Sequence, residues 1–166
     1  YDVHLSLDVF GVTGWERPQD VANTGQDIAA LSRYCDILCP MIYPSHFFHF
    51  DSIPNPGDRP AHFIKISMLR FEKATRGTGV VIRPWLQAFS WHTHIYSPRY
   101  IQIQVQTAKQ YGGNGFQFWN AGNIYGVAMR AMPAMLARPA QYWSGGYPYG
   151  VTAATATARA TVPTGR

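Results

Sequence analysis

The feature that most constrains this sequence is a fourfold alternation of short apolar runs with segments of helical periodicity. The apolar runs span residues 3–10, 36–43, 79–87 and 115–120. The segments that follow them place apolar side chains at helical spacing over about 25–34, 61–75, 97–111 and 123–132. Strands that alternate with helices in this order predict an α/β fold with a parallel sheet, either as a barrel or as an open doubly wound sheet.

Two of the runs have the period-two pattern that gives a strand two different faces. In the first run, His4, Ser6 and Asp8 share one face, and the residues between them are apolar. In the third run, Val81, Arg83, Trp85 and Gln87 share one face, opposite Ile82, Pro84 and Leu86. We therefore expect one face of the sheet to be polar and aromatic and the other to be buried beneath helices.

The chain length limits how much of a barrel could be present. A (β/α)8 barrel typically needs about 250 residues, whereas this chain has 166, of which 46% are hydrophobic. We predict one α/β domain over residues 1–140 that holds about four βα units, too few to close a complete barrel. Residues 141–166 lose apolar periodicity and become rich in Gly, Pro, Ala and Thr, which predicts a flexible tail.

Several classes of function are disfavoured. The net charge is +5, but Lys and Arg are scattered and no nucleic-acid-binding motif is present. No stretch of about 20 apolar residues could span a membrane, and no signal-like segment reveals a compartment. On a strand, Cys35 and Cys39 would lie about 13 Å apart, too far for a disulfide or a shared metal ion. We predict buried thiols and neither a metal nor a cofactor.

The chemistry of parallel α/β sheets is found at the C-terminal ends of the strands. Asp8 is the only acidic residue at such an end, so we predict that it is catalytic. Aromatic rings there could stack on sugars, and amides and hydroxyls could bind their hydroxyl groups. The predicted substrate-binding residues are Tyr43, Ser45, Arg83, Trp85, Gln87, Gln117, Trp119 and Asn120. Arg83 could equally neutralise an internal carboxylate such as Asp8.

Glycoside hydrolysis normally uses two carboxyl groups, and the second is hard to find in this chain. Asp36 begins its strand and therefore belongs to the opposite end of the sheet. Glu16, Asp51 and Asp58 lie in loops that could reach the strand ends, although solvated loop positions explain them as well.

Five motifs, taken together, resemble the bacterial and archaeal family of putative glycosyl hydrolase domains. They are Ser-Leu-Asp-Val-Phe-Gly (6–11), Gly-Gln-Asp-Ile (25–28), Cys-Pro-Met-Ile-Tyr-Pro-Ser (39–45), Ile-Arg-Pro-Trp-Leu-Gln-Ala-Phe (82–89) and Gly-Phe-Gln-Phe-Trp-Asn (115–120). The resemblance implies a (β/α)8 barrel similar to the α-amylase superfamily and a carbohydrate substrate. It also implies that residues 1–140 are the C-terminal half of a (β/α)8 TIM barrel, with its last four strands. A preceding strand would then carry the partner acid of Asp8.

One position departs from the family pattern. Many members have Asp directly after Trp-Leu-Gln, where this chain has Ala88. The alternatives to a glycosidase therefore remain a non-catalytic carbohydrate-binding or cell-envelope module, or an inactive gene fragment. In each case we expect the open sheet edges to be covered by a missing half-barrel or by self-association.

Overall fold

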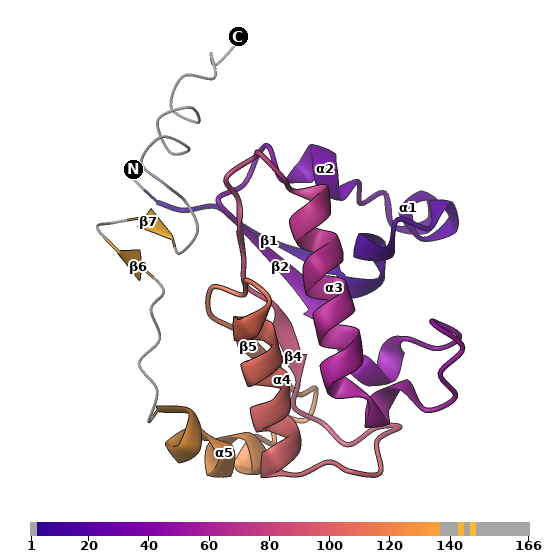
Figure 1. Cartoon of the computed structure of the whole chain (residues 1–166), viewed down its shortest axis with the longest axis vertical. Coiled ribbons are helices and arrows are strands. Elements are labelled where there is room, and N and C mark those ends of the chain that lie inside the picture. The colour runs from indigo at the N-terminus through magenta and orange to yellow at the C-terminus, as the bar shows by residue number, and fades with distance from the viewer. Residues whose placement is uncertain (1–2, 137–142, 145–146, 149–166) are drawn as a thin grey trace, which may run out of the picture.

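Five parallel strands in chain order form the main sheet. The computed structural model describes residues 3–136, 143–144 and 147–148. The strands are β1 (Ser6–Phe10), β2 (Ile37–Ile42), β3 (Val81–Ile82), β4 (Trp85–Gln87) and β5 (Gln117–Trp119). β1 pairs with β2, β2 pairs with both β3 and β4, and β4 pairs with β5 (Figure 1). The predicted α/β fold with a parallel sheet is confirmed.

The third predicted strand is divided in two. Residues 79–87 were expected to form one strand, but Arg83 and Pro84 separate β3 from β4. Proline has no backbone N–H to donate to a neighbouring strand. The chain nevertheless keeps its direction, because the Arg83 backbone N–H donates to the Leu38 carbonyl (2.9 Å) and Gln117 donates to the Pro84 carbonyl (2.9 Å).

The longer helices begin where the sequence predicts. α3 (Pro60–Ala74) and α4 (Pro98–Gln110) each have proline in the first turn, where no intrahelical donor is lost. The Ser97 hydroxyl caps α4 by accepting from the Tyr100 backbone N–H. α5 spans Gly126–Leu136.

The region after β1 differs from the prediction. The helix expected over 25–34 is reduced to α2 (Ile28–Leu31), capped by the Asp27 carboxylate. A further helix, α1 (Pro18–Thr24), precedes it and was not predicted. None of its residues is buried, so it lacks the apolar stripe that identifies a helix in sequence.

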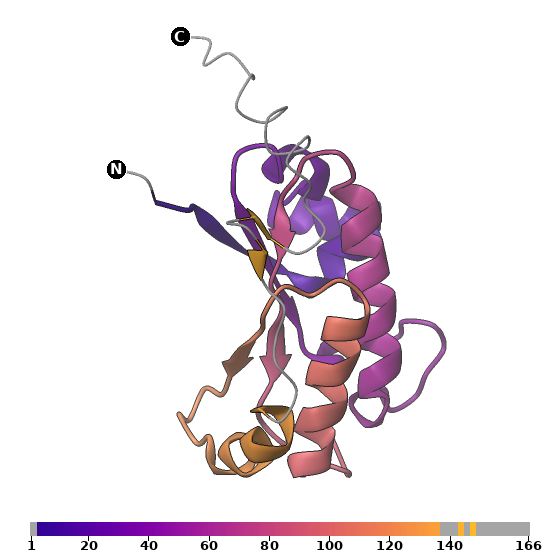
Figure 2. The ribbon, with the colours of Figure 1, turned by 60° about the vertical axis from the view of Figure 1, so that its left-hand side comes forward.

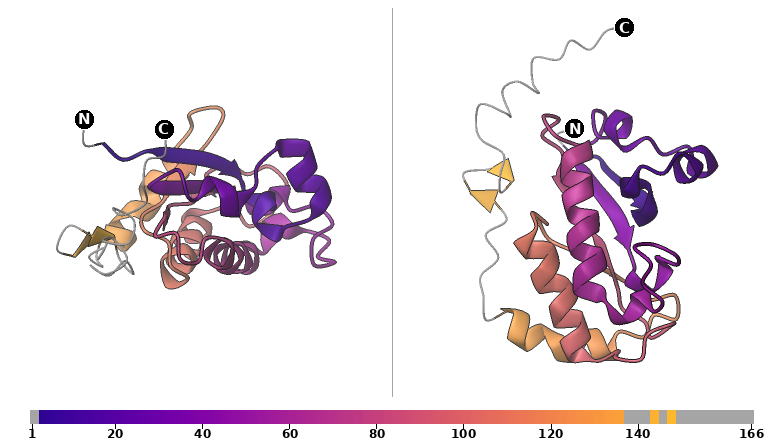
Figure 3. Two further views of the ribbon diagram at one scale, coloured as in Figure 1. Left: turned by 90° about the horizontal axis from the view of Figure 1, so that it is seen from above. Right: turned by 45° about the vertical axis from the view of Figure 1, so that its right-hand side comes forward.

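The larger buried core lies on one face of the sheet, and a smaller cluster of Ile37, Cys39 and Val81 lies on the other. The buried core joins strand residues such as Val9, Leu38 and Leu86 to Phe63 of α3 and Ile101 of α4. Seen from the side and from above, α3 and α4 lie on the same side of the strands (Figures 2 and 3). The opposite side, which we call the open face, carries Ser6, Asp8, Cys39, Trp85 and Trp119. The predicted polar face is exposed in β1, at Ser6 and Asp8, whereas in β4 the predicted polar-face residue Gln87 is buried.

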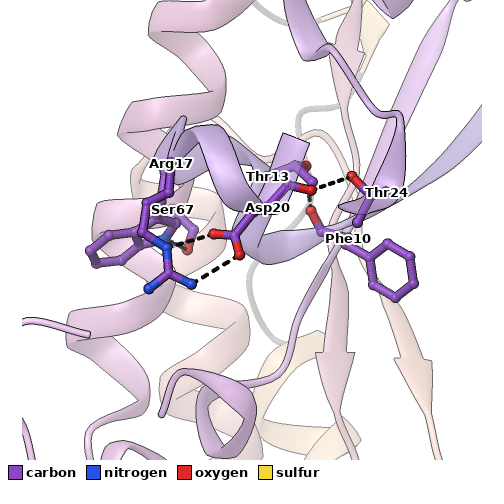
Figure 4. Close-up of polar contacts among 7 residues, drawn as sticks. Phe10, Thr13, Arg17, Asp20, Thr24 and Ser67 are labelled. Carbon is purple, nitrogen blue, oxygen red and sulfur yellow. Dashed lines mark hydrogen bonds and ion pairs between the residues drawn. The ribbon is translucent and has the colours of Figure 1, made fainter. Parts of the chain in front are cut away.

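The turn that follows β1 is tightly fixed. A Cβ atom on Gly11 would lie 2.3 Å from the Met41 carbonyl oxygen, so only glycine fits beside β2. The Thr13 hydroxyl donates to the Phe10 carbonyl (2.6 Å), and the Trp15 indole donates to Ser67 of α3 (3.2 Å) (Figure 4). This 3-10 turn, η1 (Gly11–Trp15), therefore holds the end of β1, where Asp8 lies.

The C-terminal region is described only in part. β6 (Trp143–Ser144) pairs antiparallel with β7 (Tyr147–Pro148). The rest of the predicted tail, 141–166, lies outside the described residues. Cys35 and Cys39 are both buried and are not joined by a disulfide, as predicted. Within the part of the chain that the structure describes, no helix is long and apolar enough to cross a membrane.

Candidate active site

Asp8 and Trp85 meet on the open face although 77 residues separate them in the sequence. Asp8 is paired in register with Cys39 of β2, and Met41 of the same strand is paired with Trp85. The Trp85 indole Nε1 donates a hydrogen bond to Asp8 Oδ1 at 2.9 Å. The carboxylate is solvent-exposed and its second oxygen, Oδ2, has no hydrogen bond within the described part of the chain. Asp8 is therefore oriented by one donor and still accessible to a ligand.

A second indole lies beside the first. Trp119 and Trp85 contact edge to face, with ring centroids 6.3 Å apart and planes at 90°. Trp119 is 45% exposed, so much of its ring surface faces solvent. Gln117, two residues earlier on β5, has a buried side-chain oxygen without a hydrogen-bond partner. The arrangement gives Asp8 an apolar neighbourhood with one unused polar acceptor.

Cys39 of β2 lies beside Asp8 and contacts the Ser6 hydroxyl of β1. Burial raises the pKa of the Cys39 thiol; its 3.2 Å contact with the Ser6 hydroxyl opposes the rise, the Asp8 charge adds to it, and the Arg83 charge opposes it. The net result is a raised pKa, so the thiol stays protonated at neutral pH. Cys39 is therefore a buried, uncharged residue beside Asp8 rather than a nucleophile.

Arg83 does not pair with Asp8. Its side chain is half-buried, and Nε donates to the Asn114 carbonyl oxygen (3.1 Å). Gly115 leaves room for this contact, because a Cβ atom there would lie 3.1 Å from Arg83 Nε. The guanidinium is thus held against the loop before β5, and the predicted neutralisation of an internal carboxylate is not made through Asp8.

Gln87 and Ser45 lie at the strand ends, but both are fully buried. The Gln87 side-chain oxygen accepts from the Ser45 backbone N–H (3.0 Å), and its nitrogen donates to the Phe89 carbonyl (2.9 Å). The Ser45 hydroxyl oxygen is buried without a hydrogen-bond partner. In this structure Gln87 therefore holds the loops after β2 and β4 together, and its amide has little capacity left for a sugar.

Asn120 has a similar role at the end of β5. Its amide nitrogen donates to the carbonyl oxygens of Ala88 (2.6 Å) and Ile124 (3.0 Å), and its amide oxygen accepts from the Gly122 backbone N–H (2.8 Å). These bonds shape the loop that leads to α5. Asn120 positions the Trp119 end of the strand rather than presenting a free amide.

Tyr43 is buried at the end of β2, close to the site. Burial raises the pKa of its phenol, and the nearby charges of Asp8 and Tyr125 raise it further. The phenol therefore stays neutral. Its ring meets His46 and Phe89 edge to face, with centroids 5.3 and 5.6 Å away.

The loops after β2 and β4 carry aromatic residues that were not predicted as site residues. His46, Phe48, Phe89 and Trp91 form a continuous cluster of ring contacts. The aromatic and His-rich composition of residues 88–95 was the available signal, but composition does not indicate which rings face solvent.

The acids considered as partners of Asp8 have other contacts. Asp36 accepts from the Leu5 backbone N–H (2.8 Å) at the opposite end of the sheet, as predicted. Glu16 pairs with Lys73 (3.8 Å), and Asp51 pairs with His62 (2.7 Å). Burial raises the pKa of the Asp58 carboxyl, but hydrogen bonds from His94 outweigh this and hold the pKa below its ordinary value. Asp8 is the only acidic residue within the five strands of the sheet.

Ala88 belongs to the core. It is fully buried and packs with the residues under the helices, on the side of the sheet opposite Asp8. A carboxylate at this position would require a buried polar partner.

The fold and the site together define an α/β protein with an accessible, indole-bound carboxylate on a parallel sheet. Residues 1–125 match the family described as "Putative glycosyl hydrolase domain", and the chain belongs to that family. No curated protein and no solved structure matched the chain. The predicted resemblance to this family is confirmed.

Proposed function

We propose that this protein hydrolyses O-glycosidic bonds of an oligo- or polysaccharide at the open face, with Asp8 as a catalytic carboxylate. The observation that carries the proposal is the Trp85–Asp8 hydrogen bond of 2.9 Å, which orients an exposed acid beside two indole rings. Sugar rings present C–H faces that pack on aromatic rings, and glycosidases act through positioned carboxyl groups. Family membership supports the same substrate class.

Asp8 would act either as the nucleophile or as the general acid/base. The carboxyl pairs of retaining glycosidases are about 5 Å apart, and those of inverting enzymes are about 6.5–9.5 Å apart. The three loop acids that were considered as partners, Asp51, Glu16 and Asp58, are paired with His62, Lys73 and His94. The second carboxylate is therefore proposed to come from a further strand that joins the open sheet.

The same sheet supports a proposal for the wider architecture. Its strands follow chain order and its helices pack on one face, which is how a (β/α)8 barrel is arranged, whereas a doubly wound sheet has helices on both faces. We propose that the chain contributes about four βα units of such a barrel, with the open face as its interior. Trp85, Trp119 and Tyr43 would then line the sugar-binding mouth.

The proposal is tested with the full-length gene product on a panel of polysaccharides. Hydrolysis is measured as the release of reducing ends. Asp8→Asn should lower turnover by about a hundredfold to ten-thousandfold, the range for loss of a catalytic acid or base. Asp20→Asn is the matched control, because Asp20 pairs with Arg17 on α1, away from the open face. Undiminished turnover in Asp8→Asn would remove Asp8 from catalysis, and glycan binding without hydrolysis by the unaltered protein would exclude the glycosidase.

A further inference from the structure

Two exposed aromatic rings project from the loops that follow β2 and β4. Phe48 is 39% exposed and Trp91 is 49% exposed. Their rings meet edge to face with centroids 5.6 Å apart. His46 contacts Trp91 at 5.2 Å and Phe89 at 5.7 Å. We call these four residues (His46, Phe48, Phe89 and Trp91) the aromatic platform.

The outward position of Phe48 is imposed by its neighbours. Phe47 and Phe50 are buried and pack around Trp15 and Phe63 in the core. Because these two residues turn inward, Phe48 between them projects outward. Phe47 and Phe50 therefore fix the loop to the core, and the Phe48 ring is left at the surface.

The two loops are fastened to each other. The Gly57 carbonyl accepts hydrogen bonds from the hydroxyls of Thr93 (3.0 Å) and Tyr100 (2.9 Å). The Asp58 carboxylate is bonded to the backbone N–H and the ring of His94, each at 2.7 Å. These contacts, which we call the loop clasp, hold the platform rings in place before any ligand arrives, and this lowers the entropy cost of binding.

The platform is continuous with the candidate active site. Tyr43 contacts both His46 and Phe89 edge to face, and Tyr43 is close enough to Asp8 for the carboxylate charge to act on its phenol. A row of rings thus leads from the Asp8 end of the sheet to Trp91. Tyr43 is the buried link between the two.

The platform is also uncharged. Residues 44–50 and 88–95 contain neither Lys nor Arg. Burial of part of the His46 imidazole lowers its pKa, so that ring remains neutral at physiological pH. Nucleic-acid binders combine stacking rings with a basic groove, which is missing from these two segments. A neutral ligand with a flat C–H surface fits better.

We propose that the aromatic platform is a second glycan-binding subsite, which holds a sugar unit of a polysaccharide chain that extends away from Asp8 over the loops after β2 and β4. The inference rests on the proposed function and deepens it, because it assigns the substrate to extended chains of neutral sugars. Trp91 and Phe48 provide the stacking surface, and His46 and Phe89 support it.

The test compares binding of short and long glycans. Neutral gluco-, xylo- and manno-oligosaccharides, from the disaccharide to the hexasaccharide, are titrated against the unaltered protein, Trp91→Ala and Phe48→Ala, with calorimetry as the readout. Each substitution should weaken binding of the longest oligosaccharide that the protein prefers by about tenfold, which corresponds to about one stacking contact. Binding of the disaccharide should not change. Tyr34→Ala, at an aromatic residue that is 78% exposed on the turn before β2, is the matched control.

The outcomes separate this inference from the proposed function. If Asp8→Asn still hydrolyses glycans while Trp91→Ala loses affinity for long chains, the catalytic proposal fails and the platform stands. Equal losses for short and long glycans, a loss of the same size in Tyr34→Ala, or no binding of any glycan on the panel would overturn the platform. Binding of single-stranded DNA that is abolished by Trp91→Ala would overturn it too. Matching thermal unfolding midpoints exclude misfolding as the cause.

Discussion

At the scale of single residues, the sequence predicted which side chains reach the strand ends but not what they bond. Asp8 was identified because it is the only acid at a strand end. Its bond to Trp85 joins strands that are not adjacent, so neither local pattern nor register of one pair reveals it. Gln87 and Asn120 were predicted to bind sugar from their position. Their amides satisfy backbone groups of the loops, which only the three-dimensional path of those loops determines, and sugar binding by them stays a prediction.

The first prediction at this scale concerns Trp85 as a positioning residue. Trp85→Phe keeps an aromatic ring but removes the N–H that orients Asp8 Oδ1. A hydrogen bond to a charged group contributes about 1.5 kcal/mol or more, so kcat on a hydrolysed glycan should fall about tenfold. Steady-state kinetics measures the change.

Trp119→Phe is the matched control for that prediction. Trp119 contacts the Trp85 ring edge to face, whereas the bond to Asp8 comes from Trp85. We expect its kcat to stay within about twofold of the unaltered value, with any loss appearing in KM. Equal losses of kcat in the two variants would show that Trp85 acts by packing and not by its indole donor.

At the scale of elements, periodicity identified the strands and the long helices, and two local features escaped it. Pro84 interrupts the third strand because it cannot donate to the ladder, even though the apolar pattern continues through it. α1 is exposed along its whole length, so it has no apolar stripe to detect. The loop clasp is a third case, since its partners belong to loops 36 residues apart.

The clasp gives a prediction at this scale. A Cβ atom on Gly57 would lie 2.1 Å from the His92 carbonyl oxygen, so Gly57→Ala must push the two loops apart. Overpacking of this kind typically costs about 1–3 kcal/mol of stability. The free energy of unfolding, measured by denaturant titration, should fall by that amount.

Gly126→Ala provides the comparison for the clasp. A Cβ atom there would meet only Arg130 Nη1, at 3.6 Å, which is an ordinary contact. At the start of α5 this substitution should change the free energy of unfolding by less than about 1 kcal/mol, or raise it slightly. If Gly57→Ala were as harmless as Gly126→Ala, the close approach of the two loops would not be rigid.

At the scale of the whole molecule, the helices cover one face of the sheet, and the open face has only a small buried cluster beside exposed residues such as Asp8. Within the described residues, β1 and β5 are edge strands, each paired on one side only. The open face also exposes apolar surface, including Phe10, which is 50% exposed. Unpaired edges and apolar patches favour association. Length and strand count in the sequence anticipated this arrangement, but they could not tell which residues would be uncovered.

We therefore predict concentration-dependent self-association of the 166-residue chain, measured by sedimentation velocity. Phe10→Lys should shift the equilibrium toward the monomer, because it places a charge on the open face. Tyr34→Lys adds the same charge at an exposed site away from the strands and should have no effect. A monodisperse, cooperatively unfolding monomer of the unaltered chain would contradict the prediction.

The chain-order pairing of the strands also has a consequence for biosynthesis. Each strand after β1 joins an edge that earlier residues have already formed, and no strand must insert between two older ones. The sheet can therefore form progressively during synthesis, because each new strand pairs with a strand that has already left the ribosome. A pause in translation after α3 would leave β1, β2 and the helices that follow them folded, with one edge of β2 unpaired until β3 and β4 are synthesised.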